Sequence, residues 1–77
     1  MRFAICIENE GCDDLEVGKV YRTLPDKVAA VATHVRVVDD SGEDYLYPAA
    51  YFVAVDLPSK AARALSAAQR RAAARTA

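Results

Sequence analysis

Two cysteines and one histidine are the residues of this 77-residue chain that could bind a soft metal or support nucleophilic catalysis. Five residues separate Cys6 from Cys12, and His34 lies much further along the chain. A structural zinc site takes four ligands, usually in close pairs, and a catalytic cysteine needs a neighbouring base that activates it. The pattern meets neither requirement. We therefore predict two free thiols and a protein that is not an enzyme, with no catalytic residue, no metal and no cofactor.

Acidic side chains gather in two short stretches. Residues 39–44 carry four carboxylates, and residues 13–16 carry three more. A calcium loop places its ligands at fixed positions over about twelve residues, and the 39–44 stretch lacks that spacing. Paired catalytic carboxylates need a substrate cleft between them, for which a small domain has little room. We interpret the 39–44 stretch as a solvated hairpin turn.

The tyrosines could form a contact surface for another protein. Four of the six aromatic residues lie between Tyr45 and Phe52. Tyrosine is enriched at interface anchors because it supplies a large area at a low entropic cost. The alternative is that Tyr45 or Tyr47, which share one face of a strand, is buried with its hydroxyl at the rim. The candidate protein-binding residues are Tyr21, Tyr45, Pro48 and Tyr51.

The C-terminal segment differs in charge from the rest of the chain. Residues 1–57 carry all eleven acidic side chains against five basic ones, whereas residues 58–77 carry five basic side chains and no acid. Lysine and arginine contact phosphates. An acidic body would repel a duplex, however, and the segment lacks the aromatic residues that stack on single strands. The candidate residues for an anionic partner are Lys60, Arg63, Arg70, Arg71 and Arg75.

Short alternating segments predict the elements that would position these residues. Period-two alternation indicates a half-buried first strand, with Phe3, Ile5 and Ile7 on its apolar face and Cys6 pointing away. Turn residues separate the later strands, and Asp26 can cap a single helical turn before residue 34. Pro48-Ala49-Ala50 is expected to form a 3₁₀-like turn. Five short strands with frequent turns predict a small β-barrel or roll. The predicted strands cover residues 3–7, 19–24, 35–38, 44–47 and 52–55.

The composition changes after Leu57. Nine of the nineteen residues from Ser59 to Ala77 are alanine, the best helix former. Leu57 and Leu65 are the only large apolar side chains of this segment, so they can hold its first turns and the last residues should fray. We predict a barrel over residues 1–57 and a basic, partly frayed helical tail over residues 58–77.

Two segments resemble the Src-homology-3 (SH3) family. Asp13–Leu24 is similar to that family's diverging stretch, with an acidic pair, a core leucine, a glycine turn and an alternating strand. Residues 47–52, Tyr-Pro-Ala-Ala-Tyr-Phe, resemble its Pro-x-x-Tyr-Val ending. The resemblance covers about residues 3–57 and implies a five-stranded SH3-like barrel. It carries over only Pro48 and Tyr51 from the family's polyproline groove, since the first-strand tyrosine motif and the groove tryptophan are absent. Short bacterial proteins of unassigned role are also similar around residues 42–48.

These observations give three hypotheses. The first is a small interaction module that binds an unidentified protein partner. The second is nucleic-acid association through the basic tail, and the third is self-association as a homodimer, through the alanine-rich helix or across the strand Phe3–Ile7. Charged residues within the first twenty argue against a secretory segment, and the longest apolar run, Ala49–Val55, is too short to span a membrane. We therefore expect a cytoplasmic protein without membrane contact.

Overall fold

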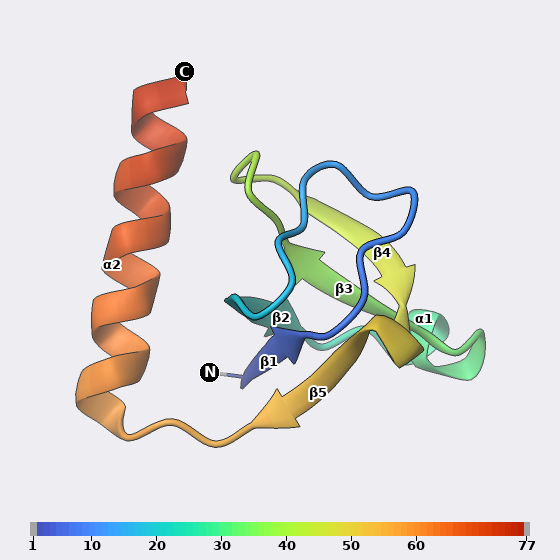
Figure 1. Cartoon of the computed structure of the whole chain (residues 1–77). Helices are drawn as coiled ribbons and strands as arrows, with labels where there is room; N and C mark the ends of the chain where they lie inside the picture. Colours follow the sequence, from blue (N-terminus) through green and yellow to red (C-terminus); the bar gives the residue numbers. More distant parts are fainter. Residues whose placement is uncertain (1, 77) are drawn as a thin grey trace.

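The computed structural model describes the backbone of residues 2–76 and the side chains of residues 2–68. Five short strands and three helical segments follow one another along this part of the chain (Figure 1). Every strand predicted from alternation is present, and the helical turn after Asp26 and the turn after Pro48 are confirmed. The elements are β1 Arg2–Cys6, β2 Val20–Leu24, α1 Lys27–Val31, β3 His34–Val38, β4 Asp44–Pro48, the 3₁₀ helix η1 Ala49–Tyr51, β5 Phe52–Val55 and α2 Ser59–Thr76.

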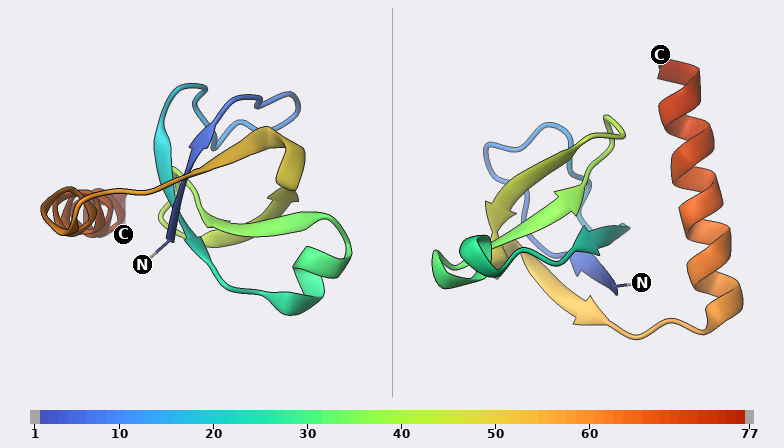
Figure 2. Two further views of the ribbon diagram at one scale, coloured as in Figure 1. Left: turned by 90° about the horizontal axis from the view of Figure 1, so that it is seen from below. Right: turned by 180° about the vertical axis from the view of Figure 1, so that it is seen from behind.

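The strands form one antiparallel sheet in the order β4-β3-β2-β1-β5. The mainly-β class is thus confirmed. Within the described residues β4 and β5 are the two edges and do not pair with each other, so the sheet is not closed into a barrel. Figure 2 shows that the sheet is strongly bent. Because β1 lies between β2 and β5, the hypothesis that strand Phe3–Ile7 pairs with a second copy across an open edge is wrong.

The core lies on the inner face of the bent sheet. Its buried side chains come from β1, β2, β3 and the loop between β1 and β2: Cys6, Tyr21, Val37 and Leu15. The Tyr21 ring packs edge-on against Phe52, with ring centres 6.3 Å apart. Aromatic pairs prefer this arrangement because the positive edge of one ring meets the negative face of the other.

The predicted orientation of the first strand is wrong. Cys6 is 1% exposed and belongs to the core, whereas Ile7 is 51% exposed. The pairing of Ala4 with Tyr21 and of Cys6 with Phe52 places the smaller side chains of β1 on the inner face. Both Phe3 and Ala4 are buried, so both faces of β1 are covered. Alternation therefore identified the strand but could not identify its inner face.

The helix α1 is held to β3 by its N-terminal cap. The Asp26 carboxylate accepts a hydrogen bond from the Ala29 amide at 2.9 Å, and Arg36 Nε of β3 donates to the same carboxylate at 3.0 Å. The cap satisfies an amide that has no partner inside the helix. Within α1 only Ala29 is buried, so apart from the cap one short side chain packs this helix on the sheet.

The helix α2 stands beside the sheet after a short connection from β5 (Figures 1 and 2). Ser66 is 4% exposed and Leu65 is half-buried, while Lys60 and Arg63 are exposed. The helical backbone continues to Thr76. The side chains of Arg70, Arg71 and Arg75, which we predicted to contact an anionic partner, lie outside the described residues, and fraying of the tail stays a prediction.

Candidate functional site

Two neighbouring aspartates in the turn after β3 meet two core tyrosines. Asp39 is 4% exposed, and its carboxylate accepts hydrogen bonds from the Tyr47 hydroxyl at 2.6 Å and from the Ser41 amide at 2.9 Å. Asp40 accepts a hydrogen bond from the Tyr21 hydroxyl at 3.0 Å and forms an ion pair with Lys19. Buried polar groups need such partners because an unpaired one loses its hydration without compensation.

The loop between β1 and β2 joins this cluster. The Asp40 amide donates to the Asp14 carbonyl at 2.9 Å, and the Glu16 amide donates to the Tyr21 hydroxyl at 2.7 Å. The two acidic stretches of the sequence therefore lie side by side. Our interpretation of residues 39–44 as a solvated turn fits the exposed Glu43 and Asp44, but it is wrong for Asp39. The Tyr47 hydroxyl compensates the burial of Asp39, and the alternation of β4 alone could not reveal that contact.

The two tyrosines act as hydrogen-bond donors in this cluster. Burial raises the pKa of Tyr21 and of Tyr47 well above the ordinary value for tyrosine, and the hydrogen bond to an aspartate raises each pKa further. Both hydroxyls therefore stay protonated at neutral pH. A protonated phenol that is fully engaged with a carboxylate is neither a base nor a nucleophile, so the cluster organises the turn.

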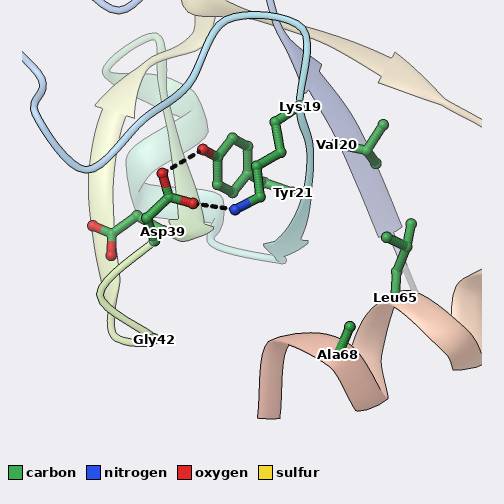
Figure 3. A pocket seen from close by; sticks show the side chains of 8 residues that line it. Lys19, Val20, Tyr21, Asp39, Gly42, Leu65 and Ala68 are labelled. Carbon is green, nitrogen blue, oxygen red and sulfur yellow. Dashed lines mark hydrogen bonds and ion pairs between the residues drawn. The ribbon is translucent and has the colours of Figure 1, made fainter. Parts of the chain in front are cut away.

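A cavity of about 290 Å³ opens beside this cluster, between β2, the turn after β3 and α2 (Figure 3). Val20 of β2 faces Leu65 and Ala68 of α2 across it. Its other end is polar, because Lys19, Tyr21 and the two aspartates contribute there. The lining residues are Lys19, Val20, Tyr21, Asp39, Asp40, Gly42, Leu65 and Ala68.

The structure does not bring the four candidate protein-binding residues together. Tyr21 is 1% exposed and lies in the core, so its ring is not available to a partner protein. Tyr45 is 49% exposed, and its hydroxyl donates to Glu43 at 2.7 Å. Pro48 and Tyr51 lie half-buried at the other end of β4, where the Tyr51 hydroxyl donates to the Glu10 carbonyl at 3.0 Å.

An exposed apolar surface on α1 escaped sequence analysis. Val28 and Val31 are 83% and 87% exposed, and we call this pair the α1 patch. Beside it lies a groove of about 640 Å³, whose lining includes Val28, Leu46 of β4 and Arg36 of β3. The short length of the helix was the one sequence feature that could have indicated this surface. A five-residue helix that buries Ala29 has no second face on which to bury two valines as well.

A metal-binding cluster and a membrane-spanning helix are both absent from the described residues. No three of their histidine, cysteine, aspartate and glutamate side chains are placed to hold a metal ion. None of the helices in the described part of the chain combines the length and apolarity needed to cross a membrane. Cys6 and Cys12 are free thiols, and burial raises the pKa of Cys6, which makes this thiol a poor nucleophile.

Comparison of the chain with protein-family models, with curated proteins and with solved structures finds no match. The candidate surfaces of the chain are the α1 patch with its groove and the cavity beside α2.

Proposed function

We propose that the protein is a small non-enzymatic interaction module that binds a partner protein through the α1 patch and the adjoining groove. We further propose that its sheet is an SH3-like roll. The segment from Tyr47 to Phe52 supports the second proposal, because Pro48 ends β4 and the 3₁₀ helix η1 leads directly into β5.

The exposure of Val28 and Val31 is the observation that carries the proposal. Burying one valine side chain contributes about 1.5–3 kcal/mol, and the fold leaves both valines more than 80% exposed. Neighbouring exposed apolar side chains beside a groove are typical of contact surfaces between proteins. These valines are available to a partner and contribute little to the fold.

The surroundings of the groove indicate which part of a partner would bind. Arg36 is already paired with Asp26 and with Asp44, each at 3.0 Å, so its positive charge is compensated. The groove therefore offers apolar contact more than charge. Next to it, β4 is an edge of the sheet, and an edge strand offers free backbone groups to a partner segment. An apolar segment of a partner protein fits this surface best.

The test compares partner capture by two matched variants. We expect the double change Val28→Ser and Val31→Ser to abolish the capture of specific partners from an extract of the native cell, with an unchanged circular dichroism spectrum. The control is Val53→Ser, since Val53 is a 49% exposed valine on β5, and it should leave capture intact. Equal capture by wild type and the double variant would contradict the proposal.

A second candidate function is nucleic-acid binding through α2, which the exposure of Lys60 and Arg63 favours. Phosphate contacts weaken steeply as salt rises. A gel-shift series with increasing salt should then show binding that Lys60→Ala and Arg63→Ala reduce together. Absence of binding at low salt would exclude this function.

A further inference from the structure

We propose that the cavity between β2 and α2 is a binding site for a small organic cation, an ammonium group carried on a short aliphatic body. The site is separate from the α1 patch, which lies on another helix and is lined by other residues. Three features carry the inference: an unfilled apolar wall, an excess of negative charge at the polar end, and an ammonium group already seated there.

The apolar wall accounts for the aliphatic body. Val20 on the sheet and Leu65 and Ala68 on the helix face each other without filling the space between them (Figure 3). The cavity is open to solvent, with Val20 and Leu65 half-buried and Ala68 exposed, so these side chains lack the dispersion contacts that a close-packed interior provides. The volume of about 290 Å³ lies at the lower end of the range for ligand pockets, which starts at about 300 Å³. A short alkyl chain would restore those contacts on both sides.

The polar end selects the charge of the ligand. Two carboxylates, Asp39 and Asp40, line it against a single cation, Lys19. Each ionised carboxylate has about four acceptor positions. Asp39 accepts three hydrogen bonds, from Tyr47 and from the amide and hydroxyl of Ser41, and Asp40 has two side-chain partners, so both retain acceptor capacity. An anionic ligand would find only a lysine that is already paired with Asp40, next to a second carboxylate.

Lys19 shows that an ammonium group fits this end of the cavity. Its Nζ pairs with Asp40 and lies 5.2 Å from the centre of the Tyr21 ring. A carboxylate together with an aromatic face is a favourable environment for a cation. The Lys19 side chain is 45% exposed, so it can turn into solvent and leave its place to the ammonium group of a ligand. Lys19 is thus a competitor for the site, and removing its charge should strengthen binding.

The experiment follows amide chemical shifts of the full chain while n-hexylammonium is added, with 1-hexanol and hexanoate as matched probes. We expect saturable shifts at Val20, Leu65 and Ala68 with n-hexylammonium, weaker binding of 1-hexanol and none of hexanoate. Absence of saturable shifts with n-hexylammonium would overturn the proposal. Equal binding of 1-hexanol or hexanoate would also overturn it, because charge would then play no part.

Three variants test how individual charges change the affinity for n-hexylammonium. Lys19→Gln should tighten n-hexylammonium binding about three- to tenfold, and Asp40→Asn should weaken it about tenfold or more. The control is Glu43→Gln, which removes an exposed carboxylate that does not line the cavity, and it should leave affinity unchanged. If the Asp40→Asn variant fails to fold, the Lys19→Gln variant still tests the proposal, because it keeps the hydrogen bond from Tyr21 to Asp40. Weaker binding by Lys19→Gln would contradict the proposal.

Discussion

The bent sheet and the helix α2 are stabilised in different ways. Hydrogen bonds between the loops of the sheet join residues far apart in the sequence, such as Tyr51 to the Glu10 carbonyl and the Asp40 amide to the Asp14 carbonyl. The helix has strong intrinsic helix propensity from its alanines, yet it meets the sheet through one face and leaves a cavity beside Leu65. The comparison indicates that the sheet with its loops is the cooperative folding unit. The packing of α2 on it can respond to a ligand.

The largest difference between the two regions should appear when a large side chain is removed from each. Tyr21→Ala takes away a 1% exposed ring from the core, and comparable aromatic deletions cost about 3–5 kcal/mol of unfolding free energy. Leu65→Ala removes a half-buried side chain of α2 and should cost about 1 kcal/mol. Urea unfolding measures both values, and equal losses would contradict the distinction between the regions.

Removing a tyrosine hydroxyl should change the free energy of unfolding less than removing a whole ring. The loss should depend on whether the carboxylate that the hydroxyl contacts is buried or exposed. Tyr47→Phe removes a hydrogen-bond donor from the buried Asp39, which should cost about 1–3 kcal/mol because the carboxylate keeps its burial without that partner. Tyr45→Phe is the matched control, since its hydroxyl meets the exposed Glu43, and it should leave stability unchanged. Urea unfolding of both variants decides whether the Tyr47–Asp39 contact supports the fold.

The cap of α1 should give a pH-dependent contribution to stability. The Ala29 amide and then Arg36 lower the pKa of Asp26 below its ordinary value. The contribution is therefore present above the pKa of Asp26 in the unfolded chain and is lost as pH falls through the lowered pKa of the folded state. Asp26→Asn keeps the capping oxygen but not the charge. It should be less stable than wild type at neutral pH, and the difference should vanish in strong acid. A difference that is constant across pH would exclude this role.

Chemical labelling of the two cysteines tests whether the core is closed and needs no substitution. Cys6 is 1% exposed and its pKa is raised by burial, whereas Cys12 is partly exposed. A thiol reagent should therefore label Cys12 quickly in the native protein and reach Cys6 only when the sheet opens. Mass spectrometry of the labelled cysteines follows both rates. Equal rates in native buffer would mean that the core around Cys6 is not closed.

Sequence analysis predicted the local elements well. The five strands, the Asp26 cap and the turn after Pro48 each depend on a few adjacent residues, and the structure confirms them. The inner face of β1 was predicted incorrectly, because it depends on the bend of the whole sheet. Alternation of Phe3, Ile5 and Ile7 gives the period of a strand without stating which side is enclosed.

The functional surfaces were harder to predict because each is made by segments distant in the sequence. The cavity is lined by Lys19, Asp40 and Leu65, which come from three separate segments of the chain. Tyr21 is aromatic like the residues of many contact surfaces, but two neighbours use its hydroxyl and it belongs to the core. Sequence analysis assigned no role to Val28 and Val31, because their short alanine- and valine-rich segment predicted only one helical turn. Only the position of α1 on β3 shows that they are exposed.

Native-state amide hydrogen exchange tests the difference between the two regions most directly. We predict that the amides of β1, β2 and β3 exchange only through global unfolding, and that those of residues 63–68 in α2 exchange through a smaller opening with a lower free energy. Saturating n-hexylammonium should slow exchange in α2 alone. Equal protection of α2 and the central strands in the free protein would contradict this account.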